Sequence, residues 1–275
     1  MGRILLITVT VIFLLFLLIM PIAFIMIEAV GSGLQPYAQA IGNQATLHAI
    51  LLTILVTAVT IVINIIIGLS GAWLISKFSF RGKAFLTTLI ELPFSISPVV
   101  VGFLFILLFG YNGWFGKLLD NYGIQIAFAV PGIILVTVFV TFPFIIRELI
   151  PLMQEQGKDE EETALSLGAR GWSIFWHITL PNIKWGLLYG VVLCLARAMG
   201  EFGAVSIISG NIQGETDTLT LHIKNLYDGY YYNEAFAVSS LLLIVALATL
   251  LIKSFLEWSF KPKTKYKTKT TLKKT

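Results

Sequence analysis

The sequence predicts an all-α integral membrane protein with six membrane-spanning helices and with both ends of the chain in the cytoplasm. Of its 275 residues, 57% are hydrophobic and 12% are charged, and the mean hydropathy is +0.87. An average soluble domain has about twice that share of charged residues. The polar residues are too few to cover a water-soluble globule. This excludes a soluble enzyme, a coiled coil, a secreted disulfide scaffold and a disordered chain.

Six stretches are long and apolar enough to be spans, since a helix needs about 20 residues to cross the bilayer. The first, 4–27, contains no charged residue and is longer than the about 7–15 apolar residues of a cleaved signal peptide, so we expect it to be retained. The remaining predicted spans are 47–76, 84–109, 124–146, 185–208 and 235–258. They must be helical, because lipid offers no partner to unpaired backbone groups.

Basic residues near the ends of the spans give their direction. With the N-terminus inside, sixteen of the 19 basic residues lie on the inner side, and only Lys117 and Lys224 lie on the outer side. This excess predicts cytoplasmic ends. Seven of the inner lysines belong to a Lys-Thr tail over 259–275. We expect that tail to be solvated near anionic membrane lipid and not to bind nucleic acid.

The hydrophilic segments suggest three parts. We expect an N-terminal span with its outer loop over 1–45, the main membrane domain over 46–258, and the tail. The inner loop over 147–184 is the largest cytoplasmic piece, and it is too short for an independent catalytic domain.

Chemistry of its own is not expected from this chain. No Gly-Lys pair in the sequence completes the phosphate-binding pattern G-x-x-x-x-G-K followed by Ser or Thr. Cys194 is the single cysteine, and the three histidines are dispersed, so we expect neither a disulfide nor a metal site. We therefore predict that the chain is not an enzyme and binds no cofactor or metal. Transport would be passive, coupled to ions, or powered by a partner.

The inner loop has features of a protein-docking segment. Three glutamates over 160–162 favour a helix start, and we expect a break at Gly168 or Gly171. The aromatic residues that follow suit an interfacial helix in the headgroup zone. The small side chains at Ala164, Gly168 and Ala169 suit close contact with another protein instead.

This loop resembles the E-A-A-x-x-x-G-x9-I-x-L-P loop of ABC importer permeases. Six of its seven specified positions match at the required spacing, and Thr163 stands in place of the first Ala. The seven positions are Glu162, Thr163, Ala164, Gly168, Ile178, Leu180 and Pro181. The resemblance implies a type I (MetI-like) permease fold, with the loop seated in a cleft of a cytoplasmic ATPase. ATP and Mg would then be bound by the partner ATPase subunits. From the same likeness we expect Glu162→Lys and Gly168→Asp to impair ATPase docking.

Two further stretches, 91–103 and 196–204, are similar to the sulfate and molybdate permeases of that family. This implies uptake of sulfate, with thiosulfate as a further substrate, across the inner (plasma) membrane, with molybdate or tungstate as the alternative. The implied partners are a homologous permease, two ATP-binding subunits, an extracytoplasmic sulfate-binding protein and membrane lipid.

Charges and breaks inside the spans mark a candidate pathway for an anion. Arg197 lies within the predicted fifth span, where a charge is costly unless it faces a cavity or a partner, and Glu201 follows four residues later. The two form either a structural ion pair or an anion-attracting site. In the third span, Ser95, Ser97 and Pro98 offer hydroxyls and a helix break.

Two alternatives stay open at this point. A proton- or sodium-coupled transporter would use Glu28, Glu91 and Glu201 as a relay, although it leaves the inner-loop pattern unexplained. A passive anion channel would conduct downhill from this chain alone. Separately, the fifth span has a small-residue seam that we expect at a helix–helix contact, with the second permease as one candidate partner. The seam consists of Gly186, Gly190, Ala196 and Gly200.

Overall fold

The computed structural model describes residues 2–259, with side chains described as far as Leu256, and these residues form helices joined by short loops. The predicted tail over 259–275 therefore lies outside the described residues except for the backbone of Ser259. The elements in chain order are α1 (Gly2–Gly31), α2 (Leu34–Gly42), α3 (Gln44–Lys77), α4 (Lys83–Ser95), α5 (Pro98–Phe109), α6 (Gly116–Asp120), α7 (Val130–Gln156), α8 (Asp159–Ser166), α9 (Gly171–Ile174), a π-helical turn (Phe175–Thr179), α10 (Leu180–Met199), α11 (Gly203–Ile208), α12 (Leu219–Asp228) and α13 (Tyr232–Ser259).

The apolar helices agree with the all-α membrane fold predicted from the sequence. Five helices in the described part are long and apolar enough to cross a membrane, and there are six if α4 and α5 count as one broken span. The predicted span over 84–109 consists of two helices, because α4 and α5 meet at 108°. The bend lies at Ile96 and Ser97, immediately before Pro98, whereas Pro93 is accommodated inside α4. Proline at the first turn of α5 has no N–H to continue the α4 ladder, so a new helix starts there.

Two predicted span boundaries are wrong. The fourth apolar helix continues to Gln156, so the first part of the predicted inner loop is helical. The fifth begins at Gly171, passes through the π-helical turn and ends at Met199. The predicted span 185–208 therefore contains the end of one helix, a break at Gly200 and Glu201, and the separate short helix α11. Apolar composition alone did not distinguish the two pieces.

The centre of the bundle is the contact of α7 with α3 and α10. A Cβ atom added to Gly68 of α3 would lie 2.5 Å from Ile145 Cγ2 of α7, so these helices approach closely only because the position is glycine. Such small-residue contacts are how helices associate in lipid, where no hydrophobic force drives them together. The interior of the bundle is therefore organised around α7.

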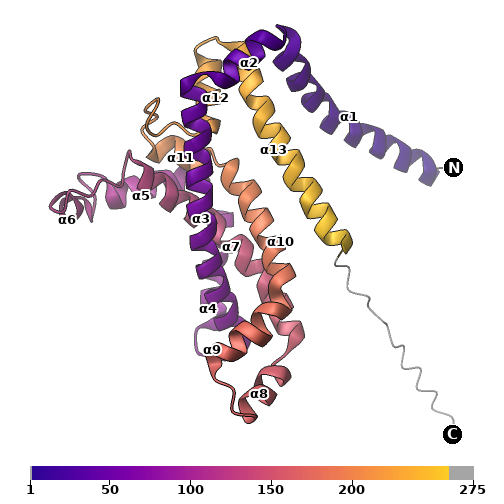
Figure 1. Ribbon diagram of the computed structural model, residues 1–275, viewed down its shortest axis with the longest axis vertical. Helices are drawn as coiled ribbons and strands as arrows, with labels where there is room; N and C mark the ends of the chain where they lie inside the picture. The colour runs from indigo at the N-terminus through magenta and orange to yellow at the C-terminus, as the bar shows by residue number, and fades with distance from the viewer. Residues whose placement is uncertain (1, 260–275) are drawn as a thin grey trace.

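Helix α5 leaves this bundle sideways. Figure 1 shows α5 and α6 projecting to one side from its middle. Helix α5 packs on α11, where a Cβ atom on Gly102 would lie 2.7 Å from Ile207 Cβ and 2.8 Å from the Ala204 carbonyl oxygen. The two broken segments of the chain, at Ser97 and at Glu201, therefore belong to one region of the fold.

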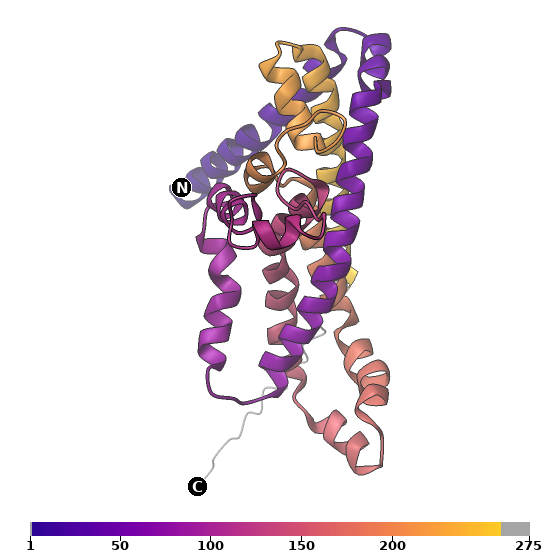
Figure 2. The same ribbon diagram turned by 90° about the vertical axis from the view of Figure 1, so that its left-hand side faces the viewer.

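The long helices run between two opposite ends of the molecule, where the connecting segments gather (Figure 1 and Figure 2). The α3–α4 turn and the α8–α9 hairpin lie together at one end, which is the lower end in Figure 2. Helices α2 and α12 lie at the opposite end (Figure 1). By the distribution of basic residues, the end with the hairpin is cytoplasmic. Helix α1 leans away from the bundle and packs against α13, where Phe24 and Phe236 meet edge to face at 5.7 Å.

Candidate functional site

The cytoplasmic hairpin is two short helices joined by a glycine turn. Gly168 has φ +86°, its N–H donates to the Leu165 carbonyl, and the Ala169 N–H donates to the Ala164 carbonyl. A left-handed residue after the last helical turn is a common helix stop, and glycine adopts it without strain. The predicted break therefore occurs at Gly168, and Gly171 begins the next helix.

The residues of the importer-like pattern lie mostly on the surface of this hairpin. Glu162 and Thr163 are exposed, Ala164 and Ala169 are half-buried, and Leu167 is 85% exposed. Further along, Ile178 and Leu180 are half-buried beside exposed Pro181. The hairpin also exposes Leu165 and Trp172. An acidic and apolar surface is thus presented at the cytoplasmic end.

The break after α10 brings a buried carboxylate to an arginine. Arg197 Nη1 lies 2.9 Å from Glu201 Oε2, with the Arg197 side chain 35% exposed and that of Glu201 1% exposed. The spacing of four residues is typical of a pair on one helical face. Glu201 instead lies beyond the end of α10, so the two residues do not share a helical face. Its second oxygen accepts from the Ala204 N–H at 3.0 Å, and its carbonyl accepts from the Thr220 hydroxyl at 2.9 Å. Glu201 therefore joins α10, α11 and α12 while it fixes one edge of the guanidinium.

Of the three residues predicted in the third span, Pro98 lies next to the start of α11, close to Glu201 in the chain. A Cβ atom on Gly203 would lie 3.0 Å from Pro98 Cβ, so the start of α5 sits against the start of α11. Ser95, the last residue of α4, and Ser97, the residue before Pro98, are both exposed. A small cavity of about 10 Å³ also borders Glu201 and is lined by Thr53, Thr57 and other residues. The buried Thr57 hydroxyl has no hydrogen-bond partner among the described residues.

The three carboxylates of the alternative ion relay are dispersed. Glu28 lies on α1, which packs mainly on α13, and Glu91 is exposed on α4, which packs on α7. Glu201 is buried in the break after α10. The described structure does not assemble these residues into a chain of neighbouring acids.

The small-residue seam of the fifth span contacts this chain itself. A Cβ atom on Gly186 would lie 2.6 Å from Leu152 Cδ2, and one on Gly190 would lie 3.2 Å from Ile145 Cα, both on α7. The predicted helix–helix contact is therefore confirmed for these two glycines. Their partner within this chain is α7.

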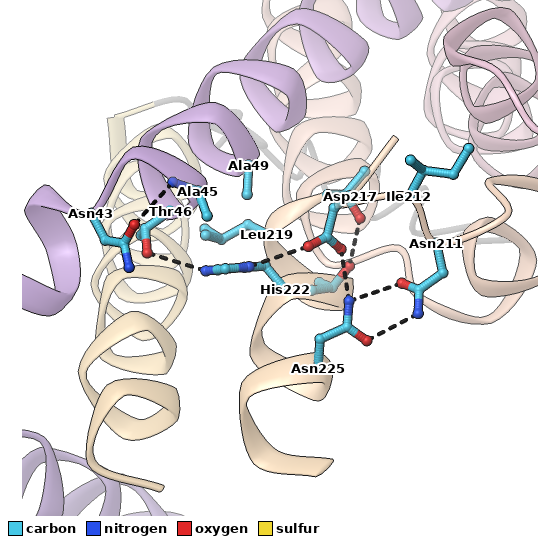
Figure 3. Close-up of polar contacts among 12 residues, drawn as sticks. Asn43, Ala45, Thr46, Ala49, Asn211, Ile212, Asp217, Leu219, His222 and Asn225 are labelled. Atoms are coloured by element: carbon cyan, nitrogen blue, oxygen red, sulfur yellow. Dashed lines mark hydrogen bonds and ion pairs between the residues drawn. The ribbon is translucent and has the colours of Figure 1, made fainter. Parts of the chain in front are cut away.

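The outer end contains a buried polar network that the sequence did not reveal. Figure 3 shows His222 between Thr46 and Asp217, with its Nδ1 3.2 Å from Asp217 Oδ2 and its Nε2 3.1 Å from Thr46 Oγ1. Asn225 and Asn211 extend the row through reciprocal amide bonds of 3.0 Å. The sequence offered no signal for this network, because its members lie in separate segments of the chain.

Both imidazole nitrogens of His222 have a hydrogen-bond partner in this network. The Thr46 hydroxyl, which also donates to the Ala40 carbonyl at 2.9 Å, lies beside Nε2, and the Asp217 carboxylate lies beside Nδ1. The ring therefore bridges the start of α3 and the residues that precede α12. The network anchors α12 to the start of α3.

Comparison with known proteins agrees with this architecture. Residues 64–261 match the family described as binding-protein-dependent transport system inner membrane component. The chain is 46% identical over 243 residues to the sulfate transport system permease protein CysW of Escherichia coli K12, covering 88% of this chain and 84% of that protein. It is 32% identical over 249 residues to the sulfate transport system permease protein CysT of Synechocystis, covering 90% and 87%.

A solved structure shares the fold. A chain in the crystal structure of a bacterial alginate ABC transporter, in complex with an alginate-bound periplasmic protein, superposes with a TM-score of 0.77 at 19% identity and covers 93% of each chain. The helical bundle, the inner hairpin and the match over most of the sequence lead to one assignment. The chain belongs to the family of binding-protein-dependent transport system inner membrane components, as a multi-pass permease most like CysW.

Proposed function

We propose that this chain is a permease subunit of an ATP-driven ABC importer that moves sulfate into the cytoplasm. The observation that carries the proposal is the exposed hairpin with the importer-like pattern, at the cytoplasmic end of a membrane bundle whose sequence has no phosphate-binding loop. The hairpin offers a surface for contact, and the sequence lacks a phosphate-binding loop. We therefore assign ATP hydrolysis to a partner that binds the hairpin. The chain itself then acts as a gate and not as an enzyme.

The docking residues follow from the exposure of the hairpin. Glu162, Thr163 and Gly168 face outward, and Leu165 and Leu167 are exposed apolar side chains beside them. Exposed apolar groups rimmed by charge are typical of protein-interaction surfaces. In the proposed complex the hairpin seats in the ATPase subunit, which binds the ATP and Mg. Closure of two such subunits would move the hairpins as levers and switch the spans between outward and inward openings.

The likeness to both CysW and CysT supports pairing with a second, homologous permease. The proposed assembly therefore contains this chain, a CysT-like permease, two ATP-binding subunits and an extracytoplasmic sulfate-binding protein. The last of these would deliver the anion to the outer end, where α2 and α12 lie.

Arg197 is the proposed anion contact in the pathway. Its guanidinium is one-third exposed, and only one of its edges is engaged by Glu201. Arginine presents five N–H donors that suit a tetrahedral oxyanion. Ser95 and Ser97 are exposed at the bend next to Pro98, and their hydroxyls add neutral donors. Because Glu201 lowers the net charge at the site, binding is weak, which lets the anion leave quickly.

The proposed substrate is inferred from the relatives, whose names specify sulfate transport. This favours sulfate over molybdate or tungstate. The test is reconstitution of the chain with its permease partner, ATPase subunits and binding protein in proteoliposomes. ATP-driven uptake of labelled sulfate is expected, with stronger competition by thiosulfate than by molybdate. Uptake that needs no ATP and stops on addition of an uncoupler would contradict the proposal.

A further inference from the structure

Lys77, the last residue of α3, is a buried lysine at the base of the cytoplasmic hairpin. Its side chain is 7% exposed, and its Nζ lies 3.0 Å from Glu161 Oε1. The same ammonium donates to the Gly157 carbonyl at 2.5 Å. A buried lysine that retains its charge needs such partners, because leaving water without them is costly.

Glu161 is tied to a second element as well. Its Oε1 accepts the hydroxyl of Thr179, at the end of the π-helical turn, at 2.8 Å. Its side chain is 20% exposed, less than that of its neighbour Glu162. Two adjacent glutamates of α8 therefore differ in role, since Glu162 faces outward and Glu161 faces the bundle.

Four helical segments meet at this cluster. Gly157 follows the last residue of α7, so the Lys77 ammonium sits at the negative end of that helix. Glu161 lies in the first turn of α8, where a carboxylate is favoured. Thr179 precedes α10. One cation thus holds the end of α3, the end of α7 and the start of α8, and through Thr179 the start of α10.

We infer that the Lys77–Glu161–Thr179 cluster is the mechanical link through which movement of the docking helix α8 reaches the spans α3, α7 and α10. The inference rests on the proposed function, in which α8 is moved by the ATPase. Helix α8 has eight residues and no buried side chain of its own, so packing does not fix its angle to the bundle. A second bond supports the same attachment, since Asn182 of α10 donates to Glu160 Oε2 at 2.6 Å.

The test measures coupling in the reconstituted complex. Lys77→Met and Glu161→Gln are each expected to leave ATPase co-purification and ATP hydrolysis within twofold of wild type, and to lower sulfate uptake per ATP hydrolysed at least tenfold. Lys77→Arg, which keeps the charge and the donors, is expected to retain most of the uptake. The double variant Lys77→Met/Glu161→Gln should be no worse than the poorer single variant, because both remove the same interaction.

A matched control lies at the other end of the molecule. Lys224 and Asp228 form an exposed pair on α12, and Lys224→Met is expected to leave the conformation of α8 unchanged. Uptake per ATP within twofold of wild type in both Lys77→Met and Glu161→Gln would overturn the inference, as would additive losses in the double variant.

Hydrogen exchange separates this inference from the proposed function. In the isolated full chain, Lys77→Met should raise amide exchange in α8 at least tenfold, and Lys224→Met should not. That comparison needs neither ATP nor a partner. If the wild-type complex takes up no sulfate with ATP, the proposed function fails, while exchange still tests the link. Unchanged exchange in α8 would overturn the link by itself.

Discussion

At the scale of single residues, each buried side chain in the described part of this membrane protein that is charged or a histidine is paired with another side chain of this kind, and each pair joins separate segments of the chain. Arg197 and Glu201 join the two sides of the break after α10. Asp217 and His222 hold α12 against α3. Because a buried charge without its partner is far more costly than a surface charge, these pairs give sharper tests than the exposed pair Lys224–Asp228.

The outer network predicts a large loss of stability from His222→Ala. The variant leaves the Asp217 carboxylate buried without its imidazole partner, which should lower the free energy of unfolding by about 3 kcal/mol. Lys224→Met on the same helix removes an exposed pair and should cost less than about 1 kcal/mol. Denaturant unfolding in detergent micelles measures both. Equal effects of the two substitutions would show that the buried contact of Asp217 with His222 does not stabilise the fold.

The second prediction concerns Arg197, which could contact the anion or only pair with Glu201. A double variant separates these two roles. Arg197→Met alone leaves Glu201 buried and unpaired, so a loss of uptake from that variant does not identify the cause. In Arg197→Met/Glu201→Gln the unpaired charge is gone. If Arg197 contacts the anion, sulfate uptake stays at least tenfold below wild type while the unfolding midpoint recovers. Recovery of uptake together with stability would assign Arg197 a structural role only.

At the scale of elements, the existence of the apolar helices is easier to predict from the sequence than the positions and angles at which they end. The apolar stretches and the glycine break at Gly168 were predictable, because both depend on local composition and backbone freedom. The 108° bend between α4 and α5 was not, since Pro98 predicts a break but carries no information about its angle. Nor was the end of α10 at Met199, because apolar residues continue on both sides of it. The angle and the end depend on tertiary contacts such as Gly102 against Ala204.

The hairpin supplies the third prediction. Gly168 has φ +86° and open space around an added Cβ atom, so the residues that tolerate this conformation, Asn and Asp, should both fold there. Gly168→Asp, which adds a negative charge to the docking surface, should weaken binding of the ATPase subunit at least tenfold. Gly168→Asn should weaken it less. Titration of the ATPase against the chain in nanodiscs measures both, with the unfolding midpoint as the control for folding. Unchanged affinity in Gly168→Asp would remove Gly168 from the docking surface.

At the scale of the whole molecule, the fold separates a cytoplasmic contact surface from an outer polar anchor by the length of the bundle (Figure 2). The family and the importer-like loop were predictable from the sequence, because six matching residues at fixed spacing carry them. The buried partners of Lys77 and His222 were not, because they come from segments distant in the chain. Local patterns thus predict the proposed docking surface, whereas the buried contacts beneath it are known only from the three-dimensional structure.

The most direct test of this account is the sidedness of ATP in proteoliposomes that contain the full complex. Two exposed residues report the orientation of each vesicle: Arg81 in the α3–α4 turn and Tyr230 beyond α12, each replaced by cysteine in a Cys194→Ala background and labelled with an impermeant maleimide. Sulfate transport is expected only when ATP is present on the side where Cys at position 81 is labelled, and transport toward that side. Equal transport without ATP, or with ATP confined to the side of position 230, would contradict this expectation.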